Sequence, residues 1–227
     1  MNGPASFDAV MIDLDGTLAD TAGEIARALN TMLEECRIAP LEPQEVAMLV
    51  GRGVQVLVDR ALDKRGAVEV DRAAAARRFH YHYARTVATD ARLYPGAREG
   101  VAMLRAARRK VAVVTNKPRS YSERLLEFLR VTDQIDALVA GDDGIARKPA
   151  GDMLVAACEK MAVQPGAALM LGDSANDVLA ARAAGCAVWC VPYGYNEGLP
   201  AGQLACDRIV ASIEEAARLL AAGGSSA

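Results

Sequence analysis

One short stretch near the start of the chain, FDAVMIDLDGTLAD at residues 7–20, constrains the fold most strongly. Its apolar run, Ala9 to Ile12, has the length of a buried strand and is too short to form a free-standing helix. The run ends at Asp13 and Asp15, whose side chains a strand would direct to the same side. In an open parallel sheet, ligands bind beyond the carboxyl ends of the strands. The stretch therefore predicts a buried strand that carries two carboxylates into a ligand site.

Two carboxylates held this close repel each other, so they need a compensating cation to stay ionised near neutral pH. Mg²⁺ is the natural partner, because it prefers oxygen ligands and often joins carboxylates to a substrate phosphate. Gly16 allows a sharp turn, and Thr17 adds a hydroxyl near the following helix. The alternative is that Asp15 and Gly16 form an ordinary turn and that Asp13 caps the end of the strand.

A second apolar run, residues 111–114, ends in Thr115 and Asn116. A hydroxyl at the end of a strand and beside the start of a helix can hold a phosphate together with backbone N–H groups. The alternative is that Thr115 or Asn116 is simply a helix N-cap. Further along, Lys148 precedes Pro149, which suits the first position of a helix. The Lys148 ammonium could neutralise phosphate charge, although a lone lysine is more often a surface residue.

A third apolar run, residues 168–171, is followed by Gly172-Asp173-Ser174-Ala175-Asn176-Asp177. Asp173 follows its strand as Asp13 follows the first one, and Asp177 falls in the first turn of the next helix. Both carboxylates are therefore candidates for the same ligand site. The alternative is that Asp173 or Ser174 caps the helix and that Asp177 compensates its dipole.

Between residues 21 and 92 the strand signals disappear and apolar residues recur at helical spacing, which predicts an inserted helical unit. Within it, Gly51-Arg52-Gly53 places a guanidinium and free backbone donors on a flexible turn. This turn is either a substrate contact or a helix C-cap with Arg52 in solvent. From residue 93 onward, strands alternate with helices, which predicts a doubly wound, mainly parallel sheet.

Composition narrows the class of protein. The chain is 52% hydrophobic and 24% charged, as expected of a soluble globular protein, and its net charge of -3 argues against non-specific nucleic-acid binding. No basic start with an apolar core opens the chain, and no apolar stretch reaches about 18 residues, so we expect no membrane span and a cytoplasmic location. The five cysteines are odd in number and show no C-x-x-C pairing, so we expect them to be reduced and structural.

The motif Asp-x-Asp-Gly-Thr-x-x-Asp at residues 13–20 resembles the opening motif of the haloacid dehalogenase-like superfamily, most of whose members are magnesium-dependent phosphohydrolases. The strand-end hydroxyl, the lysine and the later Gly-Asp motif follow in the order that this resemblance implies. It implies an α/β fold: a doubly wound, mainly parallel sheet core at residues 1–19 and 93–227, with an all-helical cap inserted at residues 20–92.

The resemblance also implies roles for individual residues. Asp13 is expected to be the nucleophile that forms an aspartyl-phosphate, and Asp15 the general acid and base. Mg²⁺ is expected to be held by Asp13, Asp173 and the main-chain carbonyl of Asp15, with Asp177 in or next to the metal shell. The phosphoryl oxygens are expected to be held by Thr115, Asn116 and Lys148.

Within the superfamily, the turn at residues 51–53, Tyr-Pro-Gly at residues 94–96 and the run that begins at Gly172 look like phosphoglycolate phosphatases. This resemblance implies a small phosphorylated metabolite, 2-phosphoglycolate, as the substrate, with Gly51, Arg52 and Gly53 setting specificity and Arg52 meeting the substrate carboxylate. The alternatives are a phosphosugar phosphatase or a phosphosugar mutase on the same core. A non-catalytic protein of this fold is disfavoured by the complete set of acids and lysine, and the oligomeric state stays open.

Overall fold

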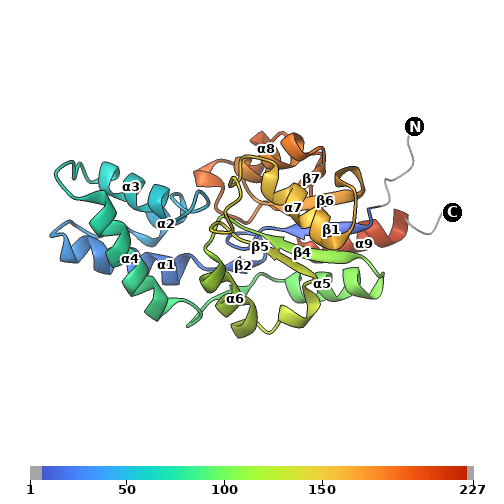
Figure 1. Cartoon of the computed structure of the whole chain (residues 1–227), viewed down its shortest axis with the longest axis horizontal. Coiled ribbons are helices and arrows are strands. Elements are labelled where there is room, and N and C mark those ends of the chain that lie inside the picture. Colours follow the sequence, from blue (N-terminus) through green and yellow to red (C-terminus); the bar gives the residue numbers. More distant parts are fainter. Residues whose placement is uncertain (1–6, 224–227) are drawn as a thin grey trace.

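The computed structural model describes residues 7–223. At its centre is a six-stranded sheet in the order β5-β4-β1-β6-β7-β8, in which neighbouring strands run parallel (Figure 1). In chain order these strands are β1 (Ala9–Ile12), β4 (Lys110–Val114), β5 (Ala137–Val139), β6 (Ala168–Gly172), β7 (Ala187–Cys190) and β8 (Arg208–Ile209). A separate antiparallel pair joins β2 (Ala19–Asp20) to β3 (Arg92–Leu93).

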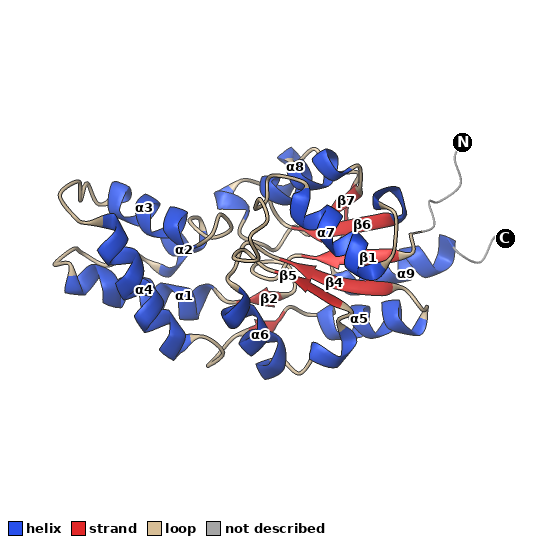
Figure 2. Cartoon of the chain, in the orientation of Figure 1, coloured by secondary structure: helices blue, strands red, loops and turns tan. Residues whose placement is uncertain are grey.

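Helices cover both faces of the sheet (Figure 2). Because side chains alternate along a strand, Val10 and Ile12 of β1 enter the core on one face, and Ala9 and Met11 enter the core on the other. The first face is covered by α5 (Ala97–Ala106), α6 (Arg119–Phe128) and α9 (Ile213–Gly223), and the second by α7 (Asp152–Met161) and α8 (Ala175–Ala184). The predicted doubly wound, parallel α/β sheet is confirmed.

The strand order places the ligand-binding edge. From the central β1 the chain builds β4 and β5 on one side and then crosses over to build β6, β7 and β8 on the other. The order therefore reverses between β1 and β6, and the crevice beyond their carboxyl ends is where such sheets bind ligands. Asp13 follows β1, and Asp173 follows β6.

Four helices lie together at one end of the molecule, away from the sheet (Figure 1). They are α1 (Ala22–Glu35), α2 (Pro43–Ala47), α3 (Val54–Lys64) and α4 (Arg72–Thr86). α4 packs against α1 and α3, and α2 packs against α1. The chain leaves the sheet through β2 and returns through β3, so the two crossing segments lie side by side. The outer ends of the predicted core, residues 1–6 and 224–227, lie outside the described residues.

The sequence prediction that a helix opens at Pro149 is wrong, because α7 begins at Asp152. The Asn116 side chain holds the preceding residue instead. It accepts from the Lys148 N–H at 3.0 Å and donates to the Lys148 carbonyl at 2.9 Å. That carbonyl is therefore bonded to a side chain, and residues 148–151 form turns before the helix starts.

Between residues 7 and 223, no helix combines the length and the apolar character needed to cross a membrane. The five cysteines are free thiols, as the sequence indicated. Cys186 and Cys190 pack in the core between the sheet and the helices α7 and α8.

Candidate active site

The ends of three neighbouring strands bring polar side chains to one place. Asp13 follows β1, Thr115 follows β4 and Asp173 follows β6, and all three residues are buried. Carboxylate oxygens of Asp13, Asp173 and Asp177 lie within 4.8 Å of one another. The structure therefore brings together three carboxylates that the sequence assigned to a metal site.

Lys148 joins two of these carboxylates. Its Nζ lies 2.9 Å from Asp13 Oδ1 and 2.7 Å from Asp177 Oδ1, and it donates to the Val114 carbonyl at 2.9 Å. Burial on its own lowers the pKa of a lysine, but the charges of Asp13 and Asp177 outweigh burial and raise the pKa of Lys148. The buried ammonium therefore stays charged and offsets part of the carboxylate charge.

Asp177 both caps a helix and holds Lys148. Its Oδ2 accepts from the N–H groups of Asp173 and Ser174 at 3.2 and 3.1 Å and from the Ser174 hydroxyl at 2.8 Å. These bonds form a capping box at the start of α8. Its Oδ1 accepts from Lys148. The capping function considered at the sequence level is therefore present, and it coexists with a contact to the site.

Asp173 is held by the loops around it. Its Oδ1 accepts from the Thr17 hydroxyl at 2.8 Å, and its Oδ2 accepts from the N–H groups of Tyr195 and Asn196 at 2.7 and 3.3 Å. Gly16 has a φ of +86°, and a Cβ at this position would lie 2.7 Å from Asp173 Oδ2. Both the backbone conformation and this close approach therefore require glycine at position 16.

The site carries more negative charge than Lys148 can offset. Burial raises the pKa of Asp13 to about 8, with Asp177 and Asp173 acting in the same direction and Lys148 opposing them. Burial also raises the pKa of Asp173 to about 6, and the charge of Asp177 adds to this. A bound cation would relieve this repulsion, and a set of carboxylate oxygens suits a hard divalent ion. The aspartate cluster can therefore hold a metal.

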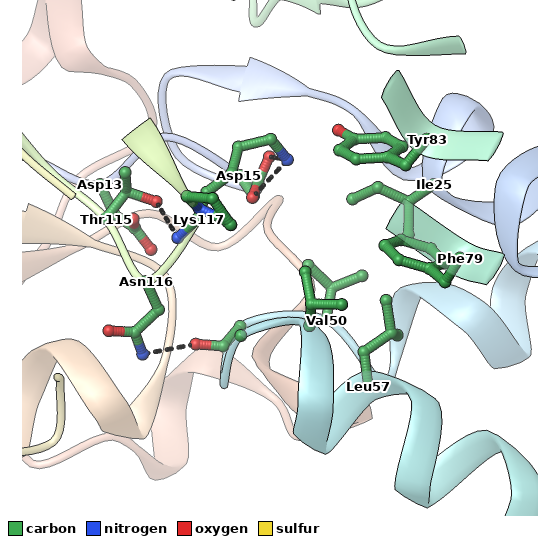
Figure 3. Close-up of a pocket in the computed structure, with 14 residues that line it drawn as sticks. Asp13, Asp15, Ile25, Val50, Leu57, Phe79, Tyr83, Thr115, Asn116 and Lys117 are labelled. Atoms are coloured by element: carbon green, nitrogen blue, oxygen red, sulfur yellow. Dashed lines mark hydrogen bonds and ion pairs between the residues drawn. The ribbon is translucent and has the colours of Figure 1, made fainter. Parts of the chain in front are cut away.

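Asp15 points away from Asp13, toward the four helices, and pairs with Lys117 (Figure 3). Lys117 Nζ lies 2.8 and 2.9 Å from the two Asp15 oxygens, and the Thr21 hydroxyl donates to Asp15 Oδ1 at 2.6 Å. No role for Lys117 was predicted from the sequence. One signal was present, because the chain has only five lysines against twenty-one arginines, and Lys117 directly follows the strand end at Thr115 and Asn116.

Asn116 connects the sheet to the helical region. Besides its two bonds to Lys148, its Nδ2 donates to the Gly51 carbonyl at 2.9 Å. The polar atoms of its side chain are thus bonded to backbone groups. The neighbouring Thr115 hydroxyl accepts from the Lys117 N–H at 3.2 Å.

The glycines and the arginine of the turn at residues 51–53 have different contacts. Gly51 and Gly53 line a pocket next to Asp13 and Asp15. The Arg52 guanidinium instead meets Glu197, which follows β7, and its Nε and Nη2 donate to the two Glu197 oxygens, the second at 3.1 Å. Arg60 Nη1 lies 3.3 Å from the same carboxylate. The structure therefore places the predicted glycines at the pocket and the predicted arginine in an ion pair.

The pocket lies between the strand ends and the helices, and its two sides differ (Figure 3). The strand ends supply a polar side: Asp13, Asp15, Thr115, Asn116 and Lys117. The helical region supplies an apolar side: Ile25, Val50, Leu57, Phe79 and Tyr83. Such a pocket suits a small ligand with a polar reacting end.

Residues 7–185 match the model of the haloacid dehalogenase-like hydrolase family. The chain is 44% identical over 223 residues to the phosphoglycolate phosphatase of Nitrosospira multiformis, covering 97% of this chain and 98% of the relative. It is 42% identical over 214 residues to a plasmid phosphoglycolate phosphatase of Cupriavidus necator, covering 93% and 92%. The crystal structure of a predicted phosphoglycolate phosphatase from Haemophilus somnus has a TM-score of 0.89 at 29% identity, covering 96% of this chain and 99% of that chain. The chain therefore belongs to the haloacid dehalogenase-like hydrolase family and is similar to phosphoglycolate phosphatases.

Proposed function

We propose that this protein hydrolyses a small phosphate monoester, 2-phosphoglycolate, to glycolate and phosphate in a Mg²⁺-dependent reaction. One observation carries the proposal: Asp13, Lys148 and Asp173 converge where the strand order reverses, with Asp15 beside them at the pocket. The similarity to enzymes named phosphoglycolate phosphatase supports the choice of substrate.

In the proposed first step, an Asp13 oxygen attacks phosphorus and the bond from phosphorus to the ester oxygen breaks. Asp15 gives a proton to the departing oxygen, which leaves as the hydroxyl of glycolate. In the second step, Asp15 takes a proton from water, the water oxygen attacks phosphorus, and the bond between phosphorus and Asp13 breaks. Inorganic phosphate leaves, and both carboxylates return to their starting states.

Mg²⁺ would be held by the carboxylates of Asp13 and Asp173 and by the main-chain carbonyl of Asp15. When bound, the ion offsets the charge that builds up on the phosphoryl oxygens. We place Asp177 next to the metal shell, because its two oxygens already hold Lys148 and the Asp173–Ser174 turn.

Phosphoryl oxygens would meet the Lys148 ammonium and the Thr115 hydroxyl, both of which are buried at the strand ends. Lys148 is already placed by Asp13 and Asp177, so little reorganisation is needed when the phosphate enters. We assign Asn116 a supporting part in phosphate binding, because its side chain fixes the backbone of Lys148.

We further propose that residues 20–92 act as a cap over a catalytic core formed by residues 1–19 and 93–227. The paired strands β2 and β3 are the two crossings between these parts. Gly51, Arg52 and Gly53 would contribute to specificity by closing the pocket, because the glycines line it and Arg52 pairs with Glu197 on the core side. A closed cap keeps water from the acyl phosphate until glycolate leaves.

The test is a phosphate-release assay on the purified protein with 2-phosphoglycolate, hexose phosphates and pentose phosphates, in Mg²⁺ and in EDTA. We expect 2-phosphoglycolate to give the highest kcat/KM and EDTA to stop release. Asp13→Asn should be inactive, whereas the matched control Asp8→Asn, at the exposed residue just before β1, should match the parent.

Three results would contradict parts of the proposal. Phosphate release that Asp13→Asn leaves intact would remove Asp13 from the nucleophile role. A higher kcat/KM for a sugar phosphate would overturn the substrate but keep the chemistry. Transfer of the phosphoryl group back to a sugar, without release of phosphate, would identify a mutase.

A further inference from the structure

Lys117 is a buried cation that the proposed chemistry does not use. It follows Asn116 at the end of β4, and its side chain is 4% exposed. Its Nζ contacts both oxygens of Asp15 and lies 4.9 Å from the centre of the Tyr83 ring on α4. An ammonium over an aromatic face is attracted by the ring and is held in orientation. The charge is therefore fixed at the border between the polar and apolar sides of the pocket.

The surroundings of Lys117 make it the natural partner for an anion. Among the described residues that line the pocket, it alone carries a positive charge. The wall beyond it is apolar, with Ile25, Phe79 and Leu57 facing the ligand space (Figure 3). A substrate carboxylate next to this apolar wall would lose its hydration, and without a cationic partner nothing would offset that cost.

The distances fit a substrate with two anionic groups close together. An ester oxygen protonated by Asp15 must lie about 3 Å from that carboxylate, and Lys117 Nζ lies 2.8 Å from it. The ester oxygen and the ammonium are then at most about 6 Å apart. In a two-carbon acid, a carboxylate oxygen lies roughly 3 Å from the ester oxygen. The carboxylate can therefore reach hydrogen-bond distance from Lys117.

We propose that Lys117 binds the carboxylate of the substrate and thereby selects phosphate esters whose leaving group carries an anion one carbon away. The ammonium has three donors, so it can keep Asp15 and add the substrate carboxylate. The proposal rests on the proposed phosphatase function and deepens it by naming the residue that reads the leaving group. It also gives Arg52, which pairs with Glu197, no part in carboxylate binding.

A neutral leaving group gives a contrasting case. With such an ester, Lys117 keeps only Asp15 as a partner, and the leaving group forms no ion pair in the pocket. Two esters with the same carbon skeleton therefore separate the two situations: 2-phosphoglycolate, and 2-hydroxyethyl phosphate, in which a hydroxymethyl group replaces the carboxylate. The ratio of their kcat/KM values measures the selection for charge.

The test compares this ratio in the parent, Lys117→Met and Lys117→Arg. We expect Lys117→Met to lower the ratio by roughly 50-fold, because a charged hydrogen bond in a desolvated pocket is lost. Lys117→Arg keeps the charge and should retain most of the selection. Lys110→Met is the matched control, since Lys110 begins the same strand β4, lies at its exposed end, and should leave the ratio unchanged. Thermal unfolding monitors whether each variant folds.

The outcomes separate this proposal from the proposed function. If the parent releases phosphate and prefers 2-phosphoglycolate, but Lys117→Met keeps that preference, the Lys117 proposal is overturned and the function stands. Equal losses for both esters would show that Lys117 acts only by positioning Asp15, which also overturns it. A parent that releases phosphate from neither ester refutes the proposed function itself. If Lys117→Met does not fold, Lys117→Arg decides the matter. A folded Lys117→Arg that no longer prefers 2-phosphoglycolate to 2-hydroxyethyl phosphate would overturn the proposal.

Discussion

Replacing Asp177 by Asn tests how the buried charges hold the site together. Asp177 is fully buried, and its carboxylate accepts from Lys148 on one oxygen and from Asp173 and Ser174 on the other. An amide is nearly the same shape, but one of its two polar ends is a donor. Whichever way the amide turns, its NH₂ group faces either the Lys148 ammonium or the N–H groups that open α8. The substitution therefore sets donor against donor inside the protein.

The expected cost follows from this geometry. Changing one partner of a buried ion pair costs about 3–5 kcal/mol when the other charge is left without compensation. Here Lys148 keeps Asp13 as a partner at 2.9 Å, so its charge stays partly compensated. The Asn oxygen also keeps part of the hydrogen bonding, so we expect the free energy of unfolding to decrease by about 3 kcal/mol, the lower end of that range. With a urea m-value of about 2–3 kcal/mol/M, the unfolding midpoint should fall by roughly 1–2 M.

Urea unfolding followed by Trp189 fluorescence is the assay, performed in EDTA. Trp189 is the single tryptophan of the chain, and it lies in β7 opposite Leu171 of β6, so it reports unfolding of the sheet. The control is Asp90→Asn, which breaks an exposed ion pair with Arg27 and should cost about 1 kcal/mol or less. Equal midpoints for Asp177→Asn and Asp90→Asn would mean that the buried contacts of Asp177 contribute no more to stability than an exposed ion pair, contrary to this prediction.

Three further predictions concern the metal, the ion pair of Arg52 with Glu197, and pH. Asp173→Asn should raise the Mg²⁺ concentration that gives half-maximal activity, because an anionic ligand of a hard cation is lost, and an unchanged value would argue against Asp173 as a ligand. Arg52→Ala and Glu197→Gln should lower kcat/KM by similar factors, because each breaks the same ion pair, and the double variant should lower it no further. A loss seen only in Arg52→Ala and only with 2-phosphoglycolate would mean that Arg52 binds substrate. The pKa values of Asp13 and Asp173, about 8 and about 6, lie above the ordinary 3.8, so their contribution to stability is present at low pH and is lost as pH rises. In EDTA, the Tm of the parent relative to Asp13→Asn should therefore fall between pH 4 and pH 8, and the Tm gain from Mg²⁺ should grow over the same window; a relative Tm that stays level would contradict this.

Local sequence patterns predicted the parts of the site that follow strands. Asp13, Thr115 and Asp173 each end an apolar run, and parallel strands bring their carboxyl ends to one edge, so pattern and topology together place these residues near each other. Gly16 was predictable for the same reason, since a turn directly after a strand that carries a ligand needs a permissive backbone.

Pairs between distant residues could not be predicted in this way. Asp15 and Lys117 are 102 positions apart, and Arg52 and Glu197 are 145 positions apart, so only tertiary packing decides that they meet. Pro149 misled the prediction of a helix start, because the Asn116 side chain, from the loop after β4, holds the backbone before it. Asp177 caps α8 with one carboxylate oxygen and contacts Lys148 with the other. An acid in the first turn of a helix fits both roles, so the sequence pattern could not distinguish them.

If phosphoryl transfer passes through Asp13, an aspartyl-phosphate forms at that residue during turnover and can be trapped. Purified protein is mixed with 2-phosphoglycolate and Mg²⁺, quenched within milliseconds and treated with borohydride, which reduces an aspartyl-phosphate to homoserine. Peptide mass spectrometry then locates the modified residue. We predict homoserine at position 13, and none when Mg²⁺ is replaced by EDTA. Phosphate release during turnover with position 13 unmodified, or with homoserine at another aspartate, would contradict the account.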